Sequence, residues 1–215
     1  MFFFNRLIAF IILLFLLPIL LFIGLIVFVE TKSFPVYLQK RGLSLTRYPF
    51  TIYKFKTIID SAKSNDSGIN IFYKEALVEY VTHFGKILRK TGLDELPQII
   101  NVLKGEMNFI GPRPLSFSDL TILLNSNPNT YLIRHNIDIK PGITGHWQVF
   151  GNRNEGLTNL LAHELYYKNN ISFKLNLKII LNTFRIIILG RHSDAIITKE
   201  IKSLYKSIPK ATGNS

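Results

Sequence analysis

The feature that most constrains the fold is an uncharged apolar run near the N-terminus. Leu7 to Val29 is 23 residues of mainly Leu, Ile, Phe, Val and Ala, interrupted by Pro18 and Gly24. At about 1.5 Å of rise per residue, a helix of this length crosses the hydrocarbon core of a bilayer. The run is too long for the apolar region of a cleaved signal peptide, and no small-residue cleavage site follows it. We therefore expect a permanent membrane anchor.

Pro18 lies in the middle of this run, where it removes a helix hydrogen bond and should bend the helix. Two topologies remain open: a kinked span, or a re-entrant helix that turns at Pro18 and leaves on the side it entered. Basic residues flank both ends, with Arg6 before the run and Lys32, Lys40 and Arg41 after it. Because positive charge stays cytoplasmic, this pattern favours the re-entrant form. That form needs a partner at membrane depth for the carbonyl near Leu14.

The charge of the chain lies outside the anchor. Arg6 and Glu30 are the only charged residues among the first thirty, so essentially all of the net +12 belongs to residues 31–215. A strongly basic body indicates an anionic partner, which can be a nucleic acid, a membrane surface or a phosphorylated substrate. The chain has no cysteine, so nothing points to a disulfide framework or a thiolate metal site.

A hairpin is predicted directly after the anchor. Apolar and polar positions alternate over residues 36–38 and 50–55, which indicates two strands separated by the basic turn 39–42. Lys54 and Lys56 stand among aromatic residues, a pattern that single-strand nucleic-acid binders also have. No RNP-type motif or recognition helix accompanies it, so we expect no nucleic-acid partner.

The rest of the chain alternates loops and helices. We expect a polar loop over residues 61–70, a helical stretch up to about residue 88, and helix over 115–136. Residues 140–151 indicate a Gly-rich turn entering a strand, whose amides can cradle a phosphate although the spacing matches no P-loop. The histidines show no paired metal-ligand spacing: His83, His135, His146, His163 and His192.

An amphipathic helix is predicted over 171–189. Lys174, Lys178 and Arg185 are spaced by four and seven residues, which places the cations on one face and leaves a broad apolar face. This pattern is typical of a helix that lies flat in a membrane surface. An ordinary core helix has the same pattern, and both interpretations remain open.

The central unit of the sequence runs from Arg89 to Pro114. Apolar residues at helical spacing predict a short buried helix from about Asp94 to Lys104, with Thr91 or Asp94 as its cap, Pro97 in its first turn and Gly105 at its end. The first turn of a helix favours negative charge, so Asp94 and Glu95 would stay ionised there. Such carboxylates can bind a metal or attack phosphorus, but they are also ordinary first-turn residues.

Several motifs together resemble a known family. In order, they are Gln39-Lys40-Arg41-Gly42, Tyr53-Lys54-Phe55-Lys56-Thr57, Leu88-Arg89-Lys90-Thr91, Leu93-Asp94-Glu95-Leu96-Pro97-Gln98, Gly111-Pro112-Arg113-Pro114 and Lys140-Pro141-Gly142-Ile143-Thr144-Gly145. This order is similar to that of the bacterial sugar transferases, which are monotopic phosphoglycosyl transferases. The resemblance covers the chain from the anchor to about residue 190 and is to the minimal catalytic form.

The resemblance implies a reaction. A sugar 1-phosphate would pass from a nucleotide sugar, by family a UDP-sugar, to undecaprenyl phosphate with release of UMP, as the first membrane step of a surface glycan pathway. Asp94 would be the nucleophile and Glu95 would complete the dyad, with Mg²⁺ at Asp94 neutralising the diphosphate. Lys54, Arg89 and Arg113 would hold phosphate oxygens, with Pro112 and Pro114 shaping their loop. This chemistry agrees with general phosphoryl transfer, which needs a nucleophile, a metal and cationic donors.

The chain also departs from the family pattern. A Ser often precedes the re-entrant proline, where this chain has Leu17, and a later Asp is replaced by Asn176. Where members often carry an Asp near the second active-site loop, this chain has Glu164, which we take as a candidate metal-site or phosphate-site residue. None of these departures removes the Asp-Glu dyad.

The expected architecture is α/β: a small antiparallel sheet with short and amphipathic helices, behind one bent membrane helix. The expected parts are an anchor over residues 1–30, a catalytic domain over 31–195 and a basic tail over 196–215. The catalytic domain would face the cytoplasm at the bacterial inner membrane, in contact with lipid. The sequence leaves the sugar and the oligomeric state open, a homodimer included. The alternative function is a catalytically silent membrane protein that binds sugar nucleotides or serves as a scaffold.

Overall fold

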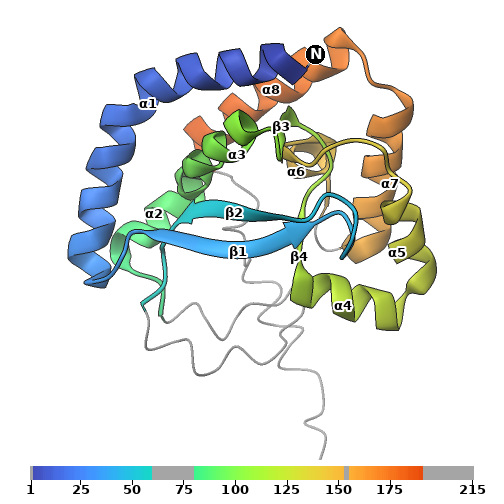
Figure 1. Cartoon of the computed structure of the whole chain (residues 1–215), viewed down its shortest axis with the longest axis horizontal. Coiled ribbons are helices and arrows are strands. Elements are labelled where there is room, and N and C mark those ends of the chain that lie inside the picture. The colour runs from blue at the N-terminus through green and yellow to red at the C-terminus, as the bar shows by residue number, and fades with distance from the viewer. Residues whose placement is uncertain (1, 60–79, 153–154, 191–215) are drawn as a thin grey trace, which may run out of the picture.

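A computed structural model describes residues 2–59, 80–152 and 155–190 (Figure 1). It confirms a mixed α/β architecture with one long N-terminal helix around the outside. The strands are β1 Val36–Gly42, β2 Phe50–Phe55, β3 Asn108–Ile110, β4 Leu115–Ser116 and β5 Gly142–Thr144. The helices are α1 Phe2–Thr31, α2 His83–Thr91, the 3-10 helix η3 Leu93–Gln98, α3 Ile99–Lys104, α4 Phe117–Ser126, α5 Pro128–His135, α6 His146–Phe150, α7 Gly156–Asn169 and α8 Phe173–Leu189. The polar loop predicted over 61–70 and the tail over 196–215 lie outside the described residues.

Helix α1 is bent and runs along two sides of the molecule (Figure 1). It changes direction near its middle (Figure 1), and Pro18 is the proline inside it. Among the described residues it is the one helix long and apolar enough to cross a membrane. Near its start, Arg6 Nη2 donates to Lys104 O over 3.1 Å, and near its end Glu30 Oε1 accepts from the Phe84 amide over 2.9 Å. Both ends therefore contact the same globular body, which favours the re-entrant topology over the kinked span.

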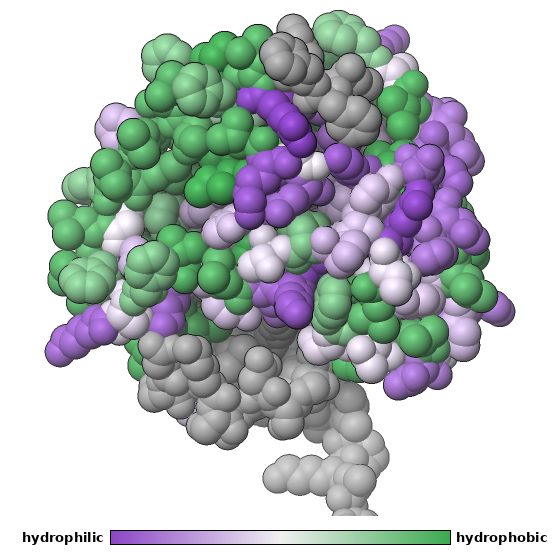
Figure 2. Space-filling model, viewed as in Figure 1, coloured by the Kyte–Doolittle hydropathy of each residue, from purple (hydrophilic) through white to green (hydrophobic). Residues whose placement is uncertain are grey.

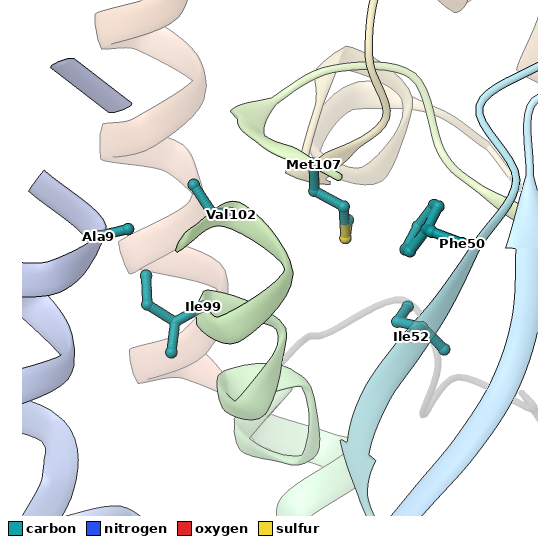
Figure 3. Packing of buried hydrophobic residues seen from close by; sticks show 6 residues of the cluster. All are labelled: Ala9, Phe50, Ile52, Ile99, Val102 and Met107. Carbon is teal, nitrogen blue, oxygen red and sulfur yellow. The ribbon is translucent and has the colours of Figure 1, made fainter. Parts of the chain in front are cut away.

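The core explains why α1 stays attached along its length. One cluster of buried side chains joins the first arm of α1 to α3 and β2 (Figure 3): Ala9, Phe50, Ile52, Ile99, Val102 and Met107. A second cluster joins the other arm to β2 and α2: Ile23, Val27, Phe55 and Leu88. Each fully buried aliphatic side chain contributes about 1.5–3 kcal/mol, so straightening the helix would expose one cluster or the other.

The predicted hairpin is present, but its turn is elsewhere. Strands β1 and β2 pair antiparallel from Val36 opposite Phe55 to Arg41 opposite Phe50, and β4 pairs with the far end of β1. The placement of a turn at 39–42 is therefore wrong, because these residues continue β1. The connection lies at 43–49 instead, and Gly42 pairs with Leu115 of β4.

The central helix is divided in two. Its first part is the 3-10 helix η3 and its second part is α3, which ends at Gly105 in the left-handed region, as predicted. The predicted caps are wrong: η3 is entered through Gly92 at φ 75°, and no side chain caps it. Asp94 lies inside η3, and the Thr91 hydroxyl donates backwards to Ile87 O over 2.8 Å.

Two further predictions change in detail. The helix predicted over 115–136 begins as strand β4 and then divides into α4 and α5 at Asn127, whose side chain caps α5 ahead of Pro128. The expectation that a strand follows the Gly-rich turn is wrong, because the strand β5 lies within the turn motif itself. Residues 146–150 then form helix α6.

Helix α8 is largely exposed along its apolar face. Its observed range matches the prediction, and only Ile179 within it is buried. The exposed apolar residues are Phe173, Leu177, Ile180, Leu181, Phe184, Ile188 and Leu189. Figure 2 shows apolar side chains gathered along the side of the molecule where α1 runs. An exposed apolar face of this kind favours a membrane-surface helix over a core helix.

Candidate active site

The acidic pair lies on η3, and Glu95 contacts strand β2 through Lys54. Asp94 is 5% exposed and Glu95 is 7% exposed. Lys54 projects from β2, is also buried, and forms an ion pair through Nζ with Glu95 Oε1. Because a buried charge needs a close partner, Lys54 and Glu95 account for each other's burial. The structure thus brings together three residues that the sequence singled out.

Two cavities meet at Glu95. A small polar cavity of about 10 Å³ is lined by Arg41, Ile52, Glu95, Gln98, Arg113, Pro114, Gly142, Ile143 and Gln148. A second, mostly apolar cavity of about 850 Å³ extends between the first arm of α1 and α8. Both are lined by Glu95, Ile143 and Gln148, so they share one polar end. Asp94 does not line either cavity and lies beside Glu95.

Two motifs far apart in sequence form the wall opposite η3. Strands β3 and β5 pair in parallel, and the Gly111 amide donates to Thr144 O over 3.0 Å while the Gly142 amide donates to Pro112 O over 3.0 Å. The backbones are so close that a Cβ on Gly145 would lie 2.1 Å from Gly111 O. Glycine is required there by contact, since any side chain would separate the two loops.

Arg113 is held through its backbone by a buried ion pair. Its N–H donates to Glu164 Oε1 over 3.1 Å, and its carbonyl accepts from Arg134 Nη2 over 2.7 Å. Arg134 Nη1 and Glu164 Oε2 are 3.2 Å apart, and the two residues are 0% and 2% exposed. This clamp leaves the Arg113 side chain directed toward the polar cavity and the Trp147 ring, whose centroid is 5.7 Å away.

Burial dominates the electrostatics of the clamp. It raises the pKa of Glu164 to about 7, against the opposing effect of Arg134 and the Arg113 N–H. It also lowers the pKa of Arg134, which Glu164 partly restores. Glu164 therefore lies beneath the Arg113 loop as a support, rather than among the residues that line the cavities.

The other predicted residues divide between the site and its surroundings. Pro114 lines the polar cavity and accepts from Arg41 Nη1 over 3.1 Å. Pro112 lies behind it in the paired loops. Arg89 is in α2, where its Nε donates to Thr57 Oγ1 over 2.8 Å, and it lines neither cavity.

Sequence reasoning missed four residues of the site. Arg41 and Gln98 were inside quoted motifs but were given no role, although Gln98 follows Glu95 by three residues and a 3-10 helix has three residues per turn. Gln148 follows the Gly-rich motif, and no residue spacing in the sequence marks it as part of the site. Arg134 ends a helix in sequence, where nothing distinguishes it from a surface cation.

The two carboxylates suit a magnesium ion whose remaining coordination positions are filled by substrate and water. Among the described residues, no group of three or more His, Cys, Asp or Glu side chains is placed to hold a metal ion. Asp94 and Glu95 therefore offer at most two protein carboxylates. Mg²⁺ is commonly held by one or two carboxylates together with substrate phosphates and water, so this donor set fits that mode of binding.

A histidine pair links helices α6 and α7. His146 Nδ1 and His163 Nδ1 are 2.8 Å apart, and the His146 ring lies 4.6 Å from that of Tyr166. Burial, with His163 and Lys178 nearby, lowers the pKa of His146 to about 4. His146 is therefore neutral at physiological pH, and the pair joins α6 to α7 as an uncharged contact.

Comparison with known proteins gives one consistent result. A family model described as "Bacterial sugar transferase" matches residues 2–190. The chain is 35% identical to the uncharacterized sugar transferase EpsL of Bacillus subtilis, with 73% of this chain and 71% of that protein covered. It is 31% identical to the exopolysaccharide production protein ExoY of Sinorhizobium fredii, with 88% and 86% covered.

A longer relative has a more specific name. The UDP-glucose:undecaprenyl-phosphate glucose-1-phosphate transferase of Klebsiella pneumoniae is 36% identical over 171 residues. The match covers 77% of this chain and 35% of that protein, so the chain spans about a third of the longer relative.

Proposed function

Because the chain belongs to the bacterial sugar transferase family, we propose that it transfers a sugar 1-phosphate from a UDP-sugar to undecaprenyl phosphate. The products are a polyprenyl diphosphate sugar and UMP. One observation carries the proposal: Glu95 of the acidic pair lies where a polar cavity lined by Arg41 and Arg113 meets a large apolar cavity. Such a junction suits a reaction between a water-soluble diphosphate and a lipid phosphate.

The apolar cavity has the lining that a polyprenyl chain requires. Ile8, Ile12 and Leu16 contribute from α1. Ile180, Phe184 and Ile187 contribute from α8. Its volume of about 850 Å³ is that of a typical ligand site. The helices beside it, α1 and α8, carry most of the exposed large apolar side chains of the described residues. A lipid lying there would bring its phosphate to the shared polar end.

The proposed chemistry has two displacements. A carboxylate oxygen of Asp94 attacks the phosphorus that bears the sugar, a new P–O bond forms, and the bond to UMP breaks so that UMP leaves. An oxygen of undecaprenyl phosphate then attacks the same phosphorus and the Asp94 carboxylate is released. A covalent intermediate of this kind predicts ping-pong kinetics.

The neighbouring residues would position the acidic pair and neutralise the negative charge of the phosphates. Lys54 holds Glu95 in place, and Arg113, fixed through its backbone, would donate to phosphoryl oxygens. Arg89, in α2, lines neither cavity and would add positive charge from outside them. A bound Mg²⁺, carried by the Asp94 and Glu95 carboxylates, would neutralise the diphosphate. We place this site on the cytoplasmic face of the inner membrane, since UDP-sugars are cytoplasmic and both ends of α1 contact the same globular part of the protein.

The direct test is a substrate panel. The protein, in detergent or membrane discs, is incubated with Mg²⁺, undecaprenyl phosphate and single UDP-sugars, and UMP release is measured. We expect release with at least one sugar, its loss in Asp94→Asn, and a phosphosugar adduct on the peptide containing Asp94 by mass spectrometry. Full activity of Asp94→Asn would refute the nucleophile. Tight UDP-sugar binding without turnover in the wild type would instead indicate a silent binding protein.

A further inference from the structure

Three amide atoms at the polar cavity have no hydrogen-bond partner within the described part of the chain. They are Nε2 of Gln98 and both Nε2 and Oε1 of Gln148, and all three are buried. Gln98 as a whole is 1% exposed. Leaving a buried polar group unpaired costs about 1–3 kcal/mol, so such atoms need a reason to be there.

The two amides come from opposite walls of the same cavity. Gln98 lies on η3 one turn after Glu95, and Gln148 lies on α6 beside the paired loops, where its Oε1 is 2.6 Å from the Cβ position of Gly145. Both side chains line the cavity of about 10 Å³ together with Arg41 and Arg113. The folding of two distant segments has thus placed two neutral N–H donors beside two guanidinium groups.

The size and charge of the cavity select its ligand. A volume of about 10 Å³ corresponds to about one water-sized group, so it admits one oxygen but not a sugar ring. The guanidinium groups favour an anionic oxygen, and the Glu95 charge is already compensated by Lys54. Because both amide atoms of Gln148 are unpartnered, its amide can turn either way without losing a hydrogen bond.

We propose that Gln98 and Gln148 form an oxyanion pocket that receives one nonbridging oxygen of the phosphoryl group at the acidic pair. This inference rests on the proposed function for the identity of that phosphoryl group, whereas the anion site itself follows from the cavity. Side-chain amides that donate to an oxygen whose negative charge grows in the transition state accelerate reactions by preorganised electrostatics. Gln98 and Gln148 are then catalytic residues alongside Asp94.

The first test uses variants that remove the donors at nearly constant length. Gln98→Met and Gln148→Met should each lower kcat for UMP release about 100-fold, the usual loss for one oxyanion donor. Gln98→Glu should be at least as inactive, because its charge repels the oxygen. The control, Asn169→Ala, removes an exposed amide at the end of α7 and should keep wild-type rates.

Thermal melting separates a ligand role from a structural one. A structural amide loses hydrogen bonds on replacement and lowers the melting temperature. Gln98 Nε2 has no partner, so Gln98→Met should melt at the wild-type temperature or above it. A clear drop for Gln98→Met, with kcat falling only in proportion to the folded fraction, would overturn the proposal.

Binding of inorganic phosphate tests the pocket without turnover. Followed by ³¹P NMR, the dissociation constant should rise about tenfold or more in Gln98→Met and Gln148→Met but not in Asn169→Ala. If the wild type releases no UMP from any sugar yet shows this pattern, the transferase proposal fails while the oxyanion pocket stands. Unchanged phosphate binding and unchanged kcat in both Met variants would refute the pocket. A change in KM confined to some sugars would also refute it, because the amides would then contact the sugar.

Discussion

Replacing Arg134 by methionine should test the clamp beneath the active site. The side chain is 0% exposed and its three polar contacts reach Glu164, Arg113 O and Leu43 O. Methionine fills a similar length but removes the cation. The variant therefore leaves the buried Glu164 carboxylate without its cation and two carbonyl groups without their donor.

The size of the stability loss can be worked out from these contacts. Removing one partner of a buried ion pair costs about 3–5 kcal/mol when the other stays charged. For a chain of this size, about 2–4 °C of melting temperature is lost per kcal/mol, which gives a decrease of roughly 6 to 20 °C. Since Glu164 and Arg134 both fix the Arg113 backbone, kcat should fall as well.

The decrease in melting temperature should be larger at high pH than at low pH. Burial already raises the pKa of Glu164 to about 7 from an ordinary 4.5, and removal of Arg134 raises it further. A carboxyl group whose pKa is raised on folding stabilises the protein below its unfolded pKa, and this contribution is lost as pH rises through the folded pKa. The decrease in melting temperature caused by Arg134→Met should therefore be smallest near pH 5 and largest near pH 8.5.

The assay is differential scanning fluorimetry at both pH values, with UMP release measured in parallel. The matched control is the double variant Arg134→Met with Glu164→Gln, which removes the buried charge and keeps an acceptor for the Arg113 N–H. It should recover much of the melting temperature at pH 8.5. An equal loss at both pH values, with no recovery in the double variant, would refute the electrostatic reasoning.

Three further outcomes follow from the structure. Because the chain has no cysteine, single variants Phe3→Cys and Lys32→Cys can be probed with a membrane-impermeant maleimide, and a re-entrant α1 requires both to react from the same side; labelling from opposite sides would establish a span. Gly145→Ala should lower the melting temperature and abolish UMP release, because the new Cβ lies 2.1 Å from the Gly111 carbonyl oxygen; wild-type melting would contradict this. His146→Asn should leave the pH profile of kcat unchanged between pH 5.5 and 8, since burial lowers the pKa of His146 to about 4; a displaced acidic limb would show that His146 titrates in the reaction.

The sequence alone determined the features that depend on near neighbours. The length and apolarity of Leu7–Val29, the bend at Pro18 and the amphipathic helix α8 all follow from residues within a few turns of one another. The acidic pair and Gly105 were located for the same reason, because a short motif and a helix end are local signals. The 3-10 geometry of η3 was not predicted, since helical spacing of apolar residues alone does not distinguish a 3-10 helix from an α-helix.

Only the tertiary structure decided how these parts form a site. The pairing of β3 with β5 joins loops that lie about thirty residues apart, and the two amides of the polar cavity come from η3 and α6. Arg134 and Glu164 meet from α5 and α7 beneath Arg113. Such contacts leave no periodic trace, because a buried cation at a helix end has the same local sequence as an exposed one. Burial and pairing are set by residues distant in the chain, so the fold had to be seen before their roles could be assigned.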